Sequence, residues 1–322
     1  MTTKIASVAN LALHVFQQHS ARATMTAAVS MNSSSRSDGV CAGIPNCTPT
    51  DRSSSSNATS TVPTCNTTGV SDQLLQRLLT TVRSLTTRDI GFDLRWVSDA
   101  SVYAAPVAYV HIMENEVFSM GIFVLRPGSR IPLHDHPGMY GVLRVVYGSL
   151  RCRSFSRLQN ISARSNLGYP KSTYSKLSGC RWQLSDLIVA RPHQDAVLTP
   201  DSPTQLLAPD EGNLHEITPV DGPAVFLDIL APPYDHDLGT RECRFYKEVE
   251  LPHPVPGRNA QSQTRIGAIV DSPALNDSRS VGTDVPVFHD SDTYPPLIYL
   301  VETNQPKDYW CESAEYVGPS VI

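Results

Sequence analysis

Short β-forming runs, separated by Pro, Gly and Asp breakers without interleaved helical patterns, dominate the chain from about Val107 onward. Strands that lack crossover helices pair in antiparallel fashion, so this series predicts an all-β jelly-roll barrel. Gly148-Ser149 is predicted to form a two-residue hairpin loop between two of the strands. The predicted strands are 109–112, 117–125, 142–147, 150–155, 182–184, 187–190, 205–207, 214–218 and 224–230.

The first 70 residues differ in composition from the rest. Residues 4–19 carry apolar side chains at helical spacing and lack acidic residues, which fits a docked N-terminal helix or a mitochondrial transit peptide; the scarcity of arginine favours the helix. A helix capped by Ser71 is expected over 72–86, with its leucine-rich face on the barrel. The chain is thus expected to comprise a short helix or targeting segment (1–22), a disordered Ser/Thr-rich linker (23–70) and a barrel domain (71–322).

The charge and cysteine content narrow the class of protein. The net charge is −5 and no basic block occurs, so a nucleic-acid partner has no electrostatic support. No apolar run approaches the roughly 20 residues that span a bilayer. The seven cysteines form no Cys-x-x-Cys pair, and without a secretory signal we expect free thiols in a reducing compartment. We therefore expect a monomeric cytoplasmic protein, with the nucleus and the mitochondrion left open.

The stretch from Pro127 to Gly138 contains the sequence His134-Asp135-His136. Successive side chains of a strand alternate between its faces, so the two histidines project to one side and Asp135 to the other. Pro and Gly on both sides indicate a rigid strand end. Two histidines can share a polar strand face without binding anything, so the pair alone indicates a metal site only weakly.

A third histidine strengthens the metal hypothesis. The pattern Gly-x5-His-x-His of residues 128–136, followed by Gly-x-x-His at 212–215, is the double signature of cupin barrels. Commoner cupins carry a glutamate ligand soon after the second histidine, where this chain has Tyr140 and Gly141. Three imidazoles suit iron, zinc or copper, and the open positions of a redox site favour Fe(II). The predicted metal ligands are His134, His136 and His215.

His193 and His236 compete for the ligand role, but both lie in turn-like stretches, where we expect them to be exposed. His111 lies in a predicted strand and is interpreted as a hydrogen-bonded structural residue.

The chain resembles the family of 2-aminoethanethiol (cysteamine) dioxygenases and plant cysteine oxidases, within the cupin superfamily. The resemblance covers roughly residues 72–320, apart from 158–180, and implies a cupin double-stranded β-helix with a few flanking helices. It implies an iron-dependent enzyme that uses O2 to convert a thiol to a sulfinic acid. The implied substrates are cysteamine and the N-terminal cysteine of peptides and proteins, the latter in hypoxia sensing through protein degradation; the spacing of residues does not separate them. The matching segments are 131–139, 147–148, 213–215, 226–235, 300–303 and 308–312.

Two further residues are predicted to line the active site. If Leu227 and Ile229 face the outer packing layer, alternation turns Asp228 toward the cavity, where it could orient a ligand histidine or receive the substrate's ammonium. The resemblance implies active-site positions for both Asp228 and Tyr234.

The sequence departs from the family near Cys243. Animal relatives have a Cys-x-Tyr arrangement that is linked to a cysteine–tyrosine crosslink, but Phe245 stands where that tyrosine would be. Tyr246 would point the other way on a strand, so we expect no such crosslink and leave Cys243 out of the catalytic residues.

Two alternatives belong to other classes. A non-enzymatic cupin that binds a metal or small ligand would take up metal without consuming oxygen. An isomerase or another cupin enzyme that uses zinc or manganese is less favoured, because the usual carboxylate ligand is missing.

Overall fold

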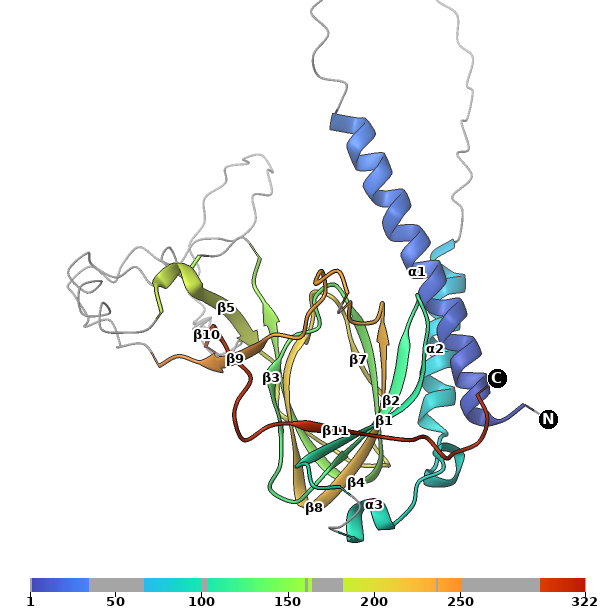
Figure 1. The fold of residues 1–322 in the computed structure, drawn as a ribbon. Helices are drawn as coiled ribbons and strands as arrows, with labels where there is room; N and C mark the ends of the chain where they lie inside the picture. The colour runs from blue at the N-terminus through green and yellow to red at the C-terminus, as the bar shows by residue number, and fades with distance from the viewer. Residues whose placement is uncertain are drawn as a thin grey trace, which may run out of the picture.

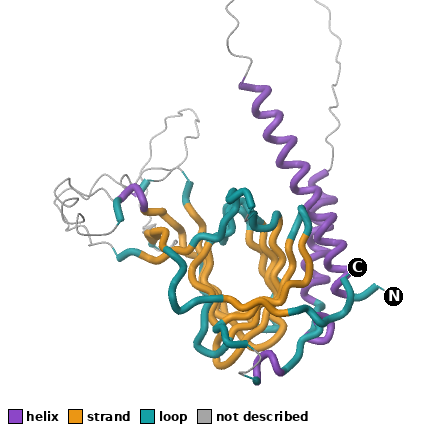
Figure 2. Tube along the Cα trace, viewed as in Figure 1, coloured by secondary structure: helices purple, strands orange, loops and turns teal. Residues whose placement is uncertain are grey.

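The computed structural model describes residues 2–34, 67–99, 103–159, 162–163, 182–235, 237–250 and 296–321. A β-barrel forms its centre, and two long helices pack side by side on one wall (Figure 1; Figure 2). The N-terminal helix and the C-terminal segment meet at this wall, where the Thr3 hydroxyl donates a hydrogen bond to the Ser320 carbonyl at 2.6 Å. No helix in the described part of the chain is long and apolar enough to cross a membrane.

The α-helices are α1 (Lys4–Ser34), α2 (Thr67–Arg83) and α3 (Arg95–Ser98), and the short 3-10 helices are η1 (Thr87–Ile90) and η3 (Leu184–Asp186). The strands are β1 (Val107–Glu114), β2 (Ser119–Leu125), β3 (Ile131–His134), β4 (Tyr140–Arg157), β5 (Leu187–Pro192), β6 (Ala196–Leu198), β7 (Gln205–Leu207), β8 (Leu214–Ala231), β9 (Phe245–Glu248), β10 (Ile298–Thr303) and β11 (Cys311–Ala314).

Strands β4 and β8 run through both halves of the barrel and pair with each other along most of their length. The first half of β4 and the second half of β8 join β2, β1, β11 and β7 in one sheet. The second half of β4 and the first half of β8 join β3, β6 and β5, and β9 and β10 extend this sheet. Two sheets that share their long strands form the predicted double-stranded β-helix, so the cupin fold is confirmed.

The hairpin predicted at Gly148-Ser149 is wrong. Both flanking runs belong to the single strand β4 and pair with β8, just as the runs predicted at 214–218 and 224–230 both belong to β8. Gly148 has a φ of +70°, and a Cβ at this position would collide with the Pro223 carbonyl. The glycine therefore lets β4 bend from one sheet to the other beside its partner strand.

The helices cover the outer face of the β1–β2–β8–β4 sheet. Buried residues of α1 and α2, including Ile5, Val15 and Leu78, pack in one cluster with Leu227 and Ile229 of β8. This packing explains why α1 is apolar at helical spacing, since one face of the helix completes the sheet's outer layer.

Several predicted boundaries differ from the structure. Residues 182–184 form no strand, and η3 begins at Leu184. Helix α2 spans Thr67–Arg83 rather than 72–86, so Ser71 lies inside it and is not its cap. Helix α1 continues to Ser34, past the predicted start of the linker, and residues 35–66 lie outside the described part of the chain. The division into three segments stays a prediction.

Candidate metal centre and active site

Three buried histidines converge at the end of strand β3. His134 ends β3 and lies directly opposite His215 of β8, and opposed residues of an antiparallel pair share one face. His136 follows after the strand ends. The three ring centroids are 4.7, 4.8 and 4.9 Å apart, and one ligand nitrogen from each ring lies within 4.8 Å of the others. The three residues of the predicted ligand set are therefore brought together.

Hydrogen bonds leave the Nε2 atoms of two of these rings free to bind a metal. Nδ1 of His134 lies 2.8 Å from the Pro132 carbonyl, which can only accept, so Nδ1 carries the proton. The hydroxyl of Tyr234 donates to the Asp135 carbonyl at 2.9 Å and lies 2.7 Å from Nδ1 of His136. Because this hydroxyl has one proton, Nδ1 of His136 must donate to it, and Nε2 of each ring keeps its lone pair.

This arrangement fits a cation. Nε2 of His136 lies only 3.1 Å from Nε2 of His215. Burial lowers the pKa of His134 to about 4 and the pKa values of His136 and His215 well below the ordinary value, so all three rings are neutral. Neutral buried imidazoles whose ring nitrogens gather this closely suit a bound metal ion. The described residues contain no other group of three His, Cys, Asp or Glu side chains with this spacing.

Among the described residues, no carboxylate joins the three histidines. Tyr140 turns its ring outward against Phe16 and His19 of α1, with centroids 6.1 and 5.1 Å apart, and Gly141 has no side chain to offer. The three histidines therefore leave coordination positions for other molecules.

Asn213 holds the main chain of His136 in place. Its Oδ1 accepts a hydrogen bond from the His136 amide at 3.0 Å, and its Nδ2 donates to the His136 carbonyl at 2.8 Å. His136 lies beyond the end of β3, so this buried amide replaces the missing strand pairing. In the sequence, only its position two residues before His215 points to Asn213, and that position indicates no particular role.

Asp135 points away from the metal ligands, as strand alternation predicts. It accepts hydrogen bonds from the Tyr246 hydroxyl at 2.7 Å and from the Arg244 amide at 3.1 Å. These bonds tie the loop between His134 and His136 to β9.

The histidines line a cavity of about 730 Å³. Asp228 and Tyr234 both lie in its wall, whereas Leu227 and Ile229 lie in the outer cluster under the helices. Desolvation raises the pKa of Asp228 from 3.8 to about 7, the value of a group that can gain or lose a proton near neutrality. Burial raises the pKa of Tyr234 well above its ordinary value, so its hydroxyl stays protonated.

The other histidines that the structure describes do not join the centre. His111 is exposed and lines the cavity, with its ring centroid 6.2 Å from that of Tyr109, rather than forming the expected hydrogen-bonded structural residue. His193 is half-buried rather than exposed, and its Nε2 lies 2.7 Å from the Ser156 hydroxyl. His236 lies outside the described residues.

Near Cys243, the two aromatic residues of β9 face in different directions. Phe245 lies in the cavity wall beside the Tyr309 ring, whose centroid is 5.8 Å away. Tyr246 is buried and hydrogen-bonded to Asp135, as alternation along the strand implies. The Cys243 thiol also lines the cavity and contacts the Tyr234 hydroxyl, and burial raises its pKa to about 11, so it stays a neutral thiol.

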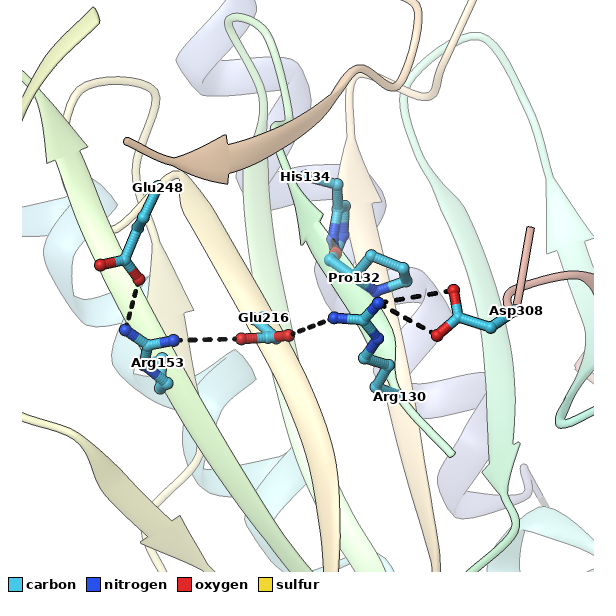
Figure 3. A network of polar contacts seen from close by, with 7 residues as sticks. All are labelled: Arg130, Pro132, His134, Arg153, Glu216, Glu248 and Asp308. Carbon is cyan, nitrogen blue, oxygen red and sulfur yellow. Dashed lines mark hydrogen bonds and ion pairs between the residues drawn. The ribbon is translucent and has the colours of Figure 1, made fainter. Parts of the chain in front are cut away.

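A chain of ion pairs runs along the barrel surface beside the strand that carries His134 (Figure 3). Arg130 bridges Glu216 at 3.3 Å and Asp308 at 3.1 Å. Arg153 bridges the other oxygen of Glu216 at 3.3 Å and Glu248 at 2.5 Å. The network joins β8, which carries His215, to the C-terminal segment whose next residues line the cavity.

Comparison with known proteins agrees with this geometry. The model of the PCO_ADO family matches residues 81–321. The chain is 36% identical over 220 residues to 2-aminoethanethiol dioxygenase of Mus musculus, covering 67% of this chain and 72% of the relative. The human protein of that name is also 36% identical, with 67% and 69% covered. Plant cysteine oxidase 1 of Arabidopsis thaliana is 32% identical over 146 residues, with 45% and 43% covered. The chain therefore belongs to the PCO_ADO family of thiol dioxygenases.

Proposed function

We propose that His134, His136 and His215 hold Fe(II) and that the chain uses O2 to oxidise the thiol of an aminothiol to the sulfinic acid. The observation that carries this proposal is the convergence of three neutral imidazoles in the wall of a cavity, in a group that includes no carboxylate of the described residues. When bound, ferrous iron would supply a redox-active centre with open positions at which O2 could react with a thiol, whose sulfur is the net electron donor.

The chain's own residues orient His136 and exclude water from the cavity. The Tyr234 hydroxyl and the Asn213 amide fix the ring and the main chain of His136. Apolar side chains, including Ile217 and Phe226, line the cavity and limit water around the reacting sulfur. In the reaction both oxygen atoms of O2 go to sulfur, and the thiol reaches the sulfinic level without another reductant.

Asp228 is the residue that we assign to the substrate's amine. A carboxylate in this cavity is costly unless a cation compensates for its lost hydration. An ammonium beside it would lower its pKa from about 7 and hold the ionised form. A substrate with an amine near its thiol would thus be held through its sulfur at the metal and through its ammonium at Asp228.

The relatives' names suggest two substrates. The mammalian relatives are named for 2-aminoethanethiol and the plant relative for cysteine. Cysteamine and the N-terminal cysteine of a polypeptide share a thiol two carbons from an amine, so both are compatible with Asp228 and the metal ligands. We place the protein in the cytoplasm, where oxidation of an N-terminal cysteine could report oxygen supply.

The test is anaerobic loading with Fe(II), followed by air and either cysteamine or a peptide that begins with cysteine. We expect iron-dependent oxygen uptake and a mass gain of about 32 Da, equal to two oxygen atoms. His215→Ala should lose both metal and activity, and zinc-loaded protein should be inactive. Metal binding without oxygen uptake with either substrate would identify a binding module instead of an enzyme.

A further inference from the structure

Gly212 lies where the chain that enters β8 diverges from β4. Phe155 of β4 is the last residue that pairs with β8, opposite Leu214, and β4 then continues beside β5. Gly212 lies two residues before β8 with a φ of +65°, so its amide is beyond the ladder. The Ser156 hydroxyl accepts a hydrogen bond from this amide at 3.0 Å. A side chain thus supplies the acceptor that a strand partner would otherwise provide.

His193 orients the Ser156 hydroxyl. The hydroxyl oxygen lies 2.7 Å from Nε2 of His193, and Ser156 is buried. This hydroxyl has one proton to donate, and among the described residues Nε2 of His193 is its only acceptor. The main chain of His193 is held in turn, because its amide donates to the Ser154 carbonyl at 2.9 Å. The bonds from Gly212 to Ser156 and from Ser156 to His193 form a relay, which we call the Ser156 relay.

The segment that this relay anchors carries two parts of the metal centre. Asn213, next to Gly212, holds the main chain of His136 through both polar atoms of its side chain. His215, three residues after Gly212, is one of the three converging histidines. A shift of Gly212 would therefore displace two of those three histidines.

Packing alone does not restrain this segment. A second cavity, of about 300 Å³, has Glu211, Gly212, His193 and His215 in its wall. His215 also lines the larger cavity, so its residue borders hollow space twice. Groups that border a cavity have fewer packed neighbours, and hydrogen bonds then provide more of the restraint.

We propose that Ser156 and His193 are positioning residues for the metal centre, which fix Gly212 and thereby the places of Asn213 and His215. This inference rests on the proposed function, because it concerns how the metal of that function is held. Neither side chain belongs to the group of three histidines, so the relay acts through the main chain of residues 212–215. Its loss should speed metal release and loosen this segment without removing a ligand.

The experiment loads the full chain with Co(II) in the absence of air and measures how fast a chelator removes the metal. Hydrogen exchange of the amides of residues 212–215 is measured on the metal-free protein, and denaturant unfolding gives its stability. Ser156→Ala should release Co(II) about tenfold faster than wild type and should exchange these amides faster. The visible absorption of bound Co(II) should also change, because the ligand geometry is less well fixed.

Two substitutions test His193. His193→Ala removes the acceptor for the Ser156 proton and should resemble Ser156→Ala. His193→Gln offers a side-chain oxygen as acceptor and should release Co(II) within about twofold of the wild-type rate. The double variant Ser156→Ala/His193→Ala should be no faster than either single variant, because the two residues act as one unit.

Ser202→Ala is the matched control. The Ser202 hydroxyl also accepts a main-chain amide bond at 3.0 Å, from Thr199, but in a turn that contains no predicted ligand. This variant should release Co(II) at the wild-type rate.

Three results would overturn the inference while leaving the metal centre in place. The first is a Ser156→Ala variant that loses stability but releases Co(II) at the wild-type rate. The second is additive effects of the Ser156 and His193 substitutions. The third is equal release by His193→Ala and His193→Gln, a comparison that decides even where Ser156→Ala does not fold. A wild-type chain that binds no Co(II) would instead refute the proposed metal centre itself.

Discussion

The phenolic oxygen of Tyr234 lies 2.7 Å from Nδ1 of His136. Tyr234 follows β8 by three residues and His136 follows β3 by two, so two irregular segments meet at this bond. The same hydroxyl donates to the Asp135 carbonyl, which determines the direction of the bond and presents Nε2 of His136 to the cavity. A residue outside the predicted ligand set thus decides the tautomer of one of its histidines.

Tyr234→Phe should weaken metal binding by about ten- to a hundredfold, because His136 loses the acceptor that orients its ring. Competition with a chelator measures this affinity. Tyr316→Phe is the control, since its hydroxyl donates to the Pro319 carbonyl near the C-terminus. Equal metal affinity in Tyr234→Phe and wild type would mean that the Tyr234 hydroxyl has no role in positioning His136.

Asn213→Ala should lower the free energy of unfolding by about 1–3 kcal/mol and also weaken metal binding, because the main-chain groups of His136 lose buried partners. Asn115→Ala is the control, because it also removes a side-chain amide that bonds the main chain. Oδ1 of Asn115 accepts hydrogen bonds from the Val117 and Phe118 amides at 2.8 and 3.0 Å, away from the histidines. Denaturant unfolding and metal titration separate the effects. If the two variants bind metal equally well, Asn213 serves stability alone.

Asp228 should make the stability of the metal-free protein depend on pH. Desolvation raises its pKa in the folded state to about 7, against 3.8 for the ordinary group, so the folded state binds the proton more tightly. Its contribution to stability is therefore complete below pH 3.8 and is lost as pH rises to about 7. Asp228→Asn should gain stability relative to wild type over this interval, measured by denaturant unfolding at several pH values. Parallel pH profiles would contradict the raised pKa.

The same variant tests the role of Asp228 in turnover. Asp228→Asn should retain iron, because this side chain does not belong to the ligand group, but should oxidise cysteamine more slowly since the neutral amide no longer attracts the ammonium. Iron content and oxygen consumption are measured on the same preparation. An unchanged rate would remove Asp228 from the mechanism.

Arg130→Gln should have a small effect despite its two ion pairs. Its side chain is 41% exposed and that of Asp308 is 67% exposed, so water and salt already screen the attraction. We expect a loss of less than about 1 kcal/mol in the free energy of unfolding, which disappears at high salt, and unchanged metal affinity. A large, salt-independent loss would show that the network of Figure 3 holds the C-terminal segment in place.

Local rules of chain geometry predicted much of the fold. Alternation placed His134 and His136 on one face and Asp135 on the other, and it also separated Asp228 from Leu227 and Ile229. The face of a strand on which a side chain lies depends only on its position relative to neighbouring residues, so it can be predicted from the sequence. The hairpin at Gly148-Ser149 failed because a glycine with positive φ serves a bend as well as a turn, and the partner strand decides between them.

A β-barrel and a pattern of three histidines near its strand ends follow from the order of the residues alone. How those histidines are held depends on tertiary contacts, because their supports come from distant parts of the chain. Asn213 supports His136 across 77 positions, and Tyr234 reaches the same ring across 98. Glu242 and Trp310 likewise reach one cavity from separate segments. Hydrogen bonds and cavity walls of this kind form only when the barrel closes. A local pattern of residues does not predict which distant residues that closure brings together.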